Sequence, residues 1–269
     1  MIKKIINILL NLIVSVLVLG VVIIVLASNT VLNKDYIKNK FKENRFYERT
    51  YSDIKNDFEN YTMQSGLELE ILDGLFTLEK VSNDIDSKID YIYDGKEFKI
   101  ETDSIRNELD SRISNALKEN NRVPSENEKK SIKKYEDVIV NSYEKGILYN
   151  KEFRINVEKY LSTAKIACIS GIVVISIILI VINRSLLKYL SFVGISLMFT
   201  GITSIGFKIL ITKRVQHILI MDAKFSNFLV NTLNDILDII KLTGIIFVVI
   251  GFLLIVLGSF EKMKKSIEK

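Results

Sequence analysis

Four long apolar segments constrain the fold of this chain more than any other feature of its sequence. They are residues 5–27, 165–183, 189–208 and 242–260. A helix needs about 20 mostly apolar residues to cross a hydrocarbon core about 30 Å thick, and each segment approaches or exceeds that length. None of them has a charged residue at its centre. The sequence therefore predicts an all-α integral membrane protein with four transmembrane helices.

The first span follows a short tail, residues 1–4, and resembles a secretory signal peptide. Val25-Leu26-Ala27 is similar to a cleavage site with small residues. However, the apolar region of a signal peptide has about 7–15 residues, and this uncharged segment is much longer. We therefore expect a retained signal anchor.

The turn between the second and third spans, residues 184–188, indicates the orientation. Four spans place both termini on the same side as this turn. Basic residues gather there: Lys3, Lys4, Arg184, Lys188, Lys262, Lys264, Lys265 and Lys269. By the positive-inside rule this side is cytoplasmic, in a plasma membrane. Residues 28–164 and 209–241 then lie outside the cell, and the tail 261–269 lies inside.

The same turn limits what the cytoplasmic side can do. It has room for about one helical turn, and both tails are short. Such segments leave no space for a catalytic loop, a nucleotide-binding site or a substantial docking helix. We therefore expect no enzyme on that side.

Residues 28–164 show helical periodicity and are long enough for a core of their own. The first stripe has spacings of three and four, which are typical of one helix face. Its members are Ile37, Phe41, Tyr47, Tyr51, Ile54, Phe58 and Tyr61. Further stripes follow at Ile71, Leu75, Leu78, Ile85, Ile89 and Ile92, and at Ile105, Leu109, Ile113 and Leu117. We predict an extracellular bundle of four helices, inserted between spans 1 and 2. The aromatic stripe belongs to its core or to a groove for a partner.

The last helix of this bundle has a clear start. Ser125 and Glu128 form a capping box, in which each side chain satisfies a backbone N–H of the other residue. The buried stripe continues through Ile132, Tyr135, Ile139, Phe153, Val157 and Leu161. Gly146 is the weak point of this helix. No other Gly or Pro appears before Gly171, so we expect it to enter the second span without a break.

The loop 209–241 is amphipathic. Its apolar residues are Ile218, Met221, Phe225, Phe228, Leu229, Leu233, Ile236, Leu237 and Ile240. We expect an outer helix that lies on the membrane interface or docks under the extracellular domain. His217, the single histidine, is interpreted as a surface residue.

Two patterns within the spans indicate helix packing. Asn7 and Asn11 share one face of the first span and are expected to form hydrogen bonds between helices. Small residues at intervals of seven allow close approach of helix backbones. They are Gly194 and Gly201 in the third span and Gly244, Gly251 and Gly258 in the fourth. The spacing suits packing within one chain or a seam between copies.

Motifs for catalysis or metal binding are not found. The single cysteine, Cys168, excludes an intrachain disulfide and is interpreted as a packing residue. Asp90, Asp94 and Glu101 fall near the spacing of a calcium loop, but Ile92 occupies a position that needs an oxygen ligand. The turn Asp94-Gly95 is better explained as a helix end. We therefore predict no catalytic, cofactor-binding or metal-ligating residues, and no cofactor.

The basic excess of the chain lies in the apolar segments and their flanks, whereas residues 28–164 are slightly acidic. The bilayer, and not nucleic acid, is the expected partner, together with another protein at the extracellular face or a second copy. Abundant Ile, Lys and Asn are typical of an AT-rich bacterial genome. We expect a non-enzymatic protein-interaction, scaffold or sensor module.

Two other functions remain open. The order of the segments, with one span, then a large outer domain, then three further spans, is similar to that of FtsX- and MacB-type ABC permease subunits. This resemblance implies a transport component. This resemblance concerns topology alone, without motif residues. The glycine seams would also suit an oligomeric pore.

Overall fold

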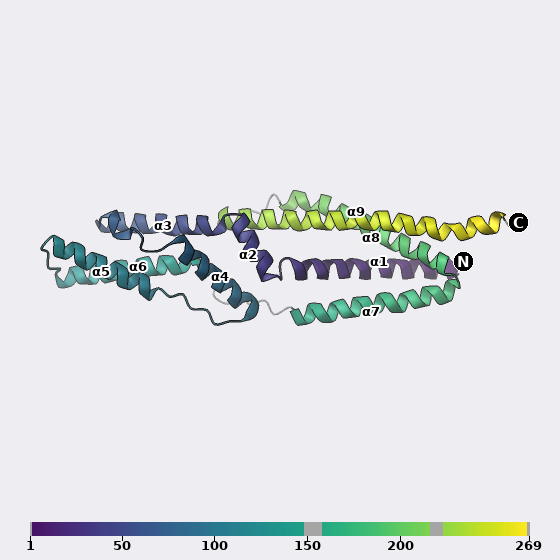
Figure 1. The fold of residues 1–269 in the computed structure, drawn as a ribbon, viewed down its shortest axis with the longest axis horizontal. Helices are drawn as coiled ribbons and strands as arrows, with labels where there is room; N and C mark the ends of the chain where they lie inside the picture. The colour runs from purple at the N-terminus through teal and green to yellow at the C-terminus, as the bar shows by residue number, and fades with distance from the viewer. Residues whose placement is uncertain (1, 148–157, 216–222, 268–269) are drawn as a thin grey trace. The chain divides into compact units, whose positions relative to one another are not determined.

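The chain forms two units in the computed structural model, which describes residues 2–147, 158–215 and 223–267. The span unit consists of Met1–Tyr36 and Asn156–Lys269, and the helical unit consists of Ile37–Ile155. All regular structure in the described residues is helical (Figure 1). The all-α prediction is confirmed.

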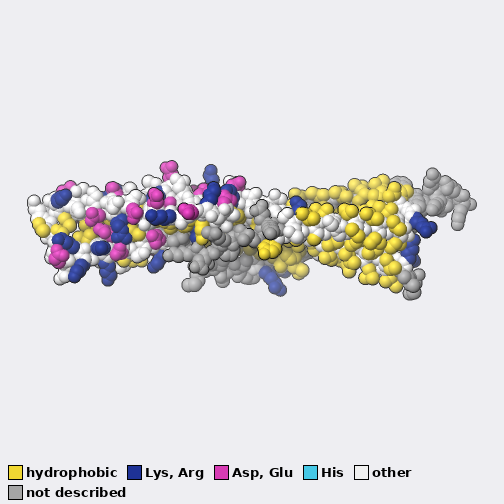
Figure 2. All heavy atoms as spheres, turned by 90° about the horizontal axis from the view of Figure 1, so that it is seen from below, with side chains coloured by type: hydrophobic (Ala, Val, Ile, Leu, Met, Phe, Trp, Pro, Cys, Tyr) yellow, Lys and Arg dark blue, Asp and Glu magenta, His cyan; other side chains and the backbone are white. Residues whose placement is uncertain are grey.

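The span unit contains α1 (Ile2–Asn29), α7 (Glu158–Asn183), α8 (Leu186–Val215) and α9 (Ala223–Ile267). Each of the four is long and apolar enough to cross a membrane. In the view of Figure 2, hydrophobic side chains dominate the surface of these helices, whereas Lys, Arg, Asp and Glu are interspersed over the helical unit. These helices indicate a multi-pass membrane protein.

The turn between α7 and α8 is even shorter than the sequence predicts. Only Arg184 and Ser185 separate the two helices. Arg184 adopts a left-handed conformation (φ 49°), which reverses the chain direction. The Ser185 hydroxyl accepts a hydrogen bond from the backbone N–H of Lys188 at 3.3 Å and so caps the first turn of α8.

The segment before the fourth span is not a separate helix. Residues 223–241 form the first part of α9, a continuous helix of 45 residues. Its length is about 67 Å at 1.5 Å per residue, so it extends well beyond a hydrocarbon core of about 30 Å. No Gly or Pro interrupts it before Gly244. His217 and Met221 lie outside the described residues.

The glycines of α8 and α9 face each other within the chain. An added Cβ on Gly194 would lie 2.6 Å from the carbonyl oxygen of Gly251, and one on Gly201 would lie 2.5 Å from that of Gly244. At Gly258 an added Cβ would overlap atoms of α8. The seven-residue spacing thus builds one antiparallel seam, in which the two backbones are in direct contact.

The helical unit contains five α-helices, of which the first begins at Lys34 in the span unit, and one short 3-10 helix. They are α2 (Lys34–Glu43), α3 (Phe46–Ser65), η1 (Leu69–Leu72), α4 (Leu78–Asp94), α5 (Asp103–Glu119) and α6 (Glu126–Ile147). α3 packs against α4, α6 and η1, and α5 packs against α6. Fully buried side chains at the centre include Ile54, Phe58, Val81, Ile105, Leu109, Ile139 and Tyr143.

The prediction for the first stripe is wrong in two respects. α2 and α3 are separate helices because Arg45 adopts a left-handed conformation (φ 52°) between them. The buried face of α3 is Thr50, Ile54, Phe58 and Thr62, with a spacing of four. Two of the predicted tyrosines, Tyr47 and Tyr51, are half-buried on its flank, and Tyr61 is exposed. Packing on α4 and α6 from two sides selects this face.

The second stripe does not form one helix. Gly74 adopts a left-handed conformation (φ 68°) and ends the η1 segment, and α4 begins only at Leu78. The Thr77 hydroxyl caps α4 by accepting a hydrogen bond from the N–H of Lys80 at 3.2 Å. The third stripe is confirmed, with Ile105, Leu109 and Ile113 buried on α5.

Gly146 has a packing role in α6. A Cβ at this position would lie 2.5 Å from Cγ1 of Ile54, so the missing side chain lets α3 approach α6 closely. The predicted continuity between this helix and the second span involves residues 148–157, including Phe153 and Val157, which lie outside the described residues.

Candidate functional site

Three helix ends meet at one end of the helical unit, opposite the turn between α2 and α3. The first is the end of α3. Gly66 takes the left-handed conformation (φ 71°) that ends this helix, and its N–H donates to the carbonyl of Met63. The N–H of Leu67 donates to the carbonyl of Thr62 at 3.4 Å. These bonds satisfy the last carbonyl groups of α3 and turn the chain into η1.

The second and third ends are those of α5 and α6. Asn121, in a left-handed conformation (φ 51°), ends α5. The capping box predicted for α6 is confirmed: the N–H of Ser125 donates to Glu128 Oε2 at 2.8 Å, and the N–H of Glu128 donates to the Ser125 hydroxyl at 3.3 Å. Local sequence thus sets both ends of the connection that carries Arg122 and Pro124.

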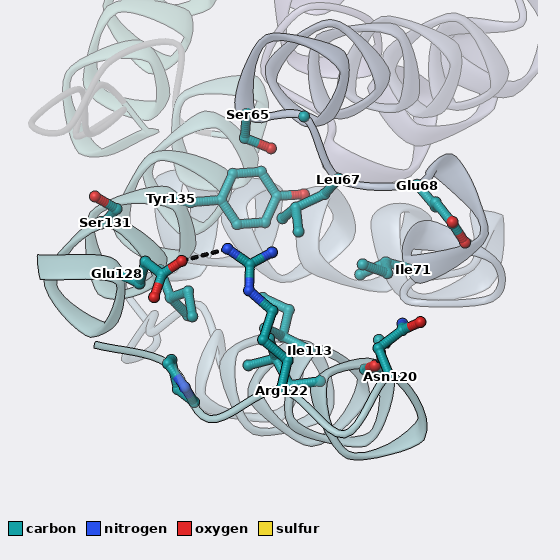
Figure 3. A pocket seen from close by; sticks show the side chains of 15 residues that line it. Ser65, Leu67, Glu68, Ile71, Ile113, Asn120, Arg122, Glu128, Ser131 and Tyr135 are labelled. Atoms are coloured by element: carbon teal, nitrogen blue, oxygen red, sulfur yellow. Dashed lines mark hydrogen bonds and ion pairs between the residues drawn. The ribbon is translucent and has the colours of Figure 1, made fainter. Parts of the chain in front are cut away.

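A cavity of about 420 Å³ lies between these three ends (Figure 3). Its volume falls within the range of about 300–1,000 Å³ that is typical of ligand pockets. Its apolar lining comes from three elements: Leu67 and Ile71 around η1, Ile113, Ala116 and Leu117 on α5, and Ile132 on α6.

One wall of the cavity is held by a buried hydrogen bond. The hydroxyls of Tyr135 and Thr62 lie 2.6 Å apart and join α6 to α3. Burial raises the pKa of Tyr135, and the bond to Thr62 partly opposes this shift. The phenol therefore stays neutral near pH 7 and its ring forms a rigid part of the lining.

Charged groups lie at the edge of the same cavity. Arg122 forms an ion pair with Glu128, and Figure 3 shows its guanidinium group over the centre of the cavity. The N–H of Ser125, its hydroxyl and Arg122 together lower the pKa of the Glu128 carboxyl group, so this group is ionised at neutral pH. Figure 3 shows a second carboxylate, Glu68, on the opposite side.

The segments at this end of the unit contribute exposed apolar side chains. Among the described residues of the helical unit, five large hydrophobic side chains are exposed. Four of them lie near the three helix ends: Tyr61, Met63, Leu69 and Val123, the last with 89% of its surface accessible. This end therefore has most of the large exposed apolar side chains among the described residues of the helical unit.

The span unit contains a second polar cluster, which the sequence indicates only in part. Asn7 is buried, and its Nδ2 donates to Oδ1 of Asn183 at 3.0 Å, with the reverse bond at 3.3 Å. Farther along α1, the Ser196 hydroxyl lies 3.1 Å from the carbonyl oxygen of Asn11. The hydroxyl of Thr200 likewise lies 3.1 Å from the carbonyl oxygen of Ser15.

Hydrogen bonding by Asn7 and Asn11 is therefore confirmed, whereas the partners on α7 and α8 were not predicted. A usable signal existed, because Ser196, Thr200 and Ser204 follow each other at intervals of four. These three residues are all buried, and Ser196 and Thr200 bind the backbone of α1, so they hold α1 against α8.

The remaining candidate residues are not brought together as a site. Asp90 pairs with Lys38 at 2.9 Å, and Lys96 lies 3.6 Å from Asp94, at the end of α4. Among the described residues, no three His, Cys, Asp or Glu side chains gather as metal ligands. Cys168 is half-buried on α7, and a Cβ on Gly20 of α1 would lie 3.4 Å from its sulfur.

No protein-family model matches this sequence, and comparisons with curated proteins and with solved structures give no match.

Proposed function

We propose that this chain is a non-enzymatic membrane protein of the cell surface that binds another protein through the end of its helical unit. The observation that carries this proposal is the combination of the cavity with exposed apolar side chains at one end of the bundle. α3 has 20 residues and a length of about 30 Å, so this end lies well away from the turn between α2 and α3.

The basic residues support the proposed orientation. Arg184 and Lys188 are exposed at the turn between α7 and α8. Both termini lie on the same side as this turn when four helices cross the membrane, and the positive-inside rule assigns that side to the cytoplasm. The helical unit, which follows α1 in the chain, is then extracellular.

The polar contacts of α1 support its role as a retained anchor. Asn7, Asn11 and Ser15 are buried against α7 and α8, and polar groups in hydrocarbon are stable only when they have such partners. Cleavage of the chain after Ala27, as in a signal peptide, would remove α1 and expose Asn183 and Ser196 to lipid. The same contacts favour a packing role for these residues over an open polar path, and therefore disfavour a pore.

Photo-crosslinking in native membranes tests the proposed function. A photoreactive amino acid at Val123 should crosslink to a discrete polypeptide, because this side chain is exposed beside the cavity. The matched control is the same amino acid at Ser52, an exposed position near the start of α3. Equal labelling from both positions, or none from Val123, would contradict the proposal. Copurification of a cytoplasmic ATPase with the full chain would support a transport component instead.

A further inference from the structure

We propose that the cavity at the end of the helical unit binds a lysine side chain of a partner polypeptide, with its ammonium group at Glu68. This inference rests on the proposed function and names the chemistry of the partner. It follows from two features of the lining: a carboxylate that has no partner, and polar side chains that have already donated hydrogen bonds within the fold.

The charge of the lining favours a cation. Its two carboxylates differ, because Glu128 forms an ion pair with Arg122, whereas Glu68 has no hydrogen bond or ion pair within the part of the chain that the structure describes. The charges of Arg122 and Glu128 cancel, so the negative charge of Glu68 remains. Figure 3 shows Glu68 and Asn120 on one side of the cavity and Glu128 on the other. A cation at Glu68 therefore completes the charge balance of the site.

Other polar groups of the lining present oxygen atoms to a ligand. The Ser65 hydroxyl donates its hydrogen to the carbonyl of Thr62 at 2.7 Å, and Nδ2 of Asn120 donates to the carbonyl of Ala116 at 2.9 Å. The side-chain oxygens of Ser65 and Asn120 are left as acceptors. An ammonium group has three donors and no acceptor, so it matches this lining. A carboxylate or a phosphate would add further acceptors and a like charge.

The mixed lining also fits the stem of a lysine side chain. Lysine carries its charge at the end of a four-carbon stem, which can lie along apolar surface while the ammonium group stays in water. Ile71 and Ile113 contribute apolar walls, and Glu68 is exposed, so an ammonium group there keeps part of its hydration. A wholly apolar side chain would instead cover Ser65 and Asn120 without replacing their bonds to water.

Zero-length crosslinking in native membranes tests this inference. A water-soluble carbodiimide activates a carboxyl group, and an amine in contact with that group displaces the urea, loses a proton and forms an amide bond. Mass spectrometry of the digested product identifies the two residues that are joined. We expect Glu68 to be joined to a lysine of the same polypeptide that a photoreactive amino acid at Val123 crosslinks.

Two neighbouring carboxylates give a matched comparison. Glu68→Gln should abolish the amide product and lower the yield of the Val123 crosslink by about twofold to fivefold, because an exposed ion pair contributes only part of the affinity. Glu70→Gln is the control, since Glu70 is exposed two residues farther along the chain and is not part of the lining. It should leave the amide product and the Val123 crosslink unchanged.

A third variant tests whether the lysine enters the cavity. Ala116→Phe adds a large side chain to the lining on α5 and should remove the Glu68 product. Circular dichroism of the purified full chain shows whether this variant keeps its helical content. Persistence of the product in a folded variant would place the lysine outside the cavity and would overturn the inference.

Other results would overturn the inference as well. Absence of an amide bond at Glu68, while Val123 still crosslinks a protein, would refute the chemistry assigned to the cavity and leave the proposed function standing. Coupling of Glu68 to a small free amine would contradict a polypeptide ligand, and equal effects of Glu68→Gln and Glu70→Gln would indicate general surface charge. Failure of both crosslinks would contradict the proposed function itself.

Discussion

Substitution of Gly201 by alanine tests whether direct backbone contact holds α8 against α9. The added Cβ would lie 2.5 Å from the carbonyl oxygen of Gly244, and ordinary contact begins at 3.4 Å. A second obstacle is the backbone nitrogen of Val248 at 3.0 Å. Because both neighbours are backbone atoms, the helices must separate by nearly 1 Å at this point.

The cost of that separation can be worked out from the packing. A gap of about 0.5–1 Å removes a quarter to a half of the dispersion energy of each contact across the seam. Overpacking of this kind costs about 1–3 kcal/mol. Gly206 lies on the same helix with nothing within 4 Å of an added Cβ, so alanine there should stabilise the helix by about 0.5–1 kcal/mol.

We therefore expect the two alanine variants to differ by about 1.5–4 kcal/mol in free energy of unfolding. The assay is unfolding of the full chain in detergent micelles by titration with a denaturing detergent, followed by circular dichroism. Gly244→Ala should behave like Gly201→Ala, because its Cβ would lie 2.8 Å from the carbonyl oxygen of Gly201. Equal stability of the variants at positions 201 and 206 would refute the seam as described.

Two further predictions concern buried polar groups. Asn183→Leu removes the hydrogen-bond partner of Asn7 and should lower the free energy of unfolding by about 1 kcal/mol. The variant with leucine at both positions should recover part of this loss. Strictly additive effects of the two substitutions in the same detergent titration would show that the pair is not coupled. Burial, and then the charge of Asp110, raise the pKa of Glu136, so the folded state holds this proton more tightly than the unfolded state. The contribution of Glu136 to stability therefore falls as pH rises above 4.5, the ordinary pKa of a glutamate. Glu136→Gln should lessen this decline and be no less stable at pH 7. An unchanged pH profile of thermal unfolding would contradict this prediction.

Features that depend on neighbouring residues in the chain were predictable. The spans follow from the length of the apolar segments, and the start of α6 follows from Ser125 and Glu128, three residues apart. The helix end at Asp94-Gly95 is of the same kind, with Gly95 in a left-handed conformation (φ 69°). In each case the interaction lies within one helical turn, so local sequence contains all of its participants.

The candidate site was not predictable in this way. Its lining comes from α3, η1, α5 and α6, and the distances between Leu67, Ile113 and Tyr135 depend on how these helices pack. No single helix carries a pattern for a cavity. Arg122 and Glu128 could be assigned to a loop and a capping box from the sequence, but their place at the edge of a cavity could not.

The sequence by itself determined the class of this protein, because hydrophobic length and helical period are properties of single segments. Tertiary structure alone decided which of several compatible faces is used. It selected Thr50 and Thr62 over Tyr47 and Tyr61 as the buried side of α3, and it joined the glycines of α8 and α9 within one chain. A periodic pattern states that a helix has a face to bury, whereas the shape of the opposing helices determines where that face is buried.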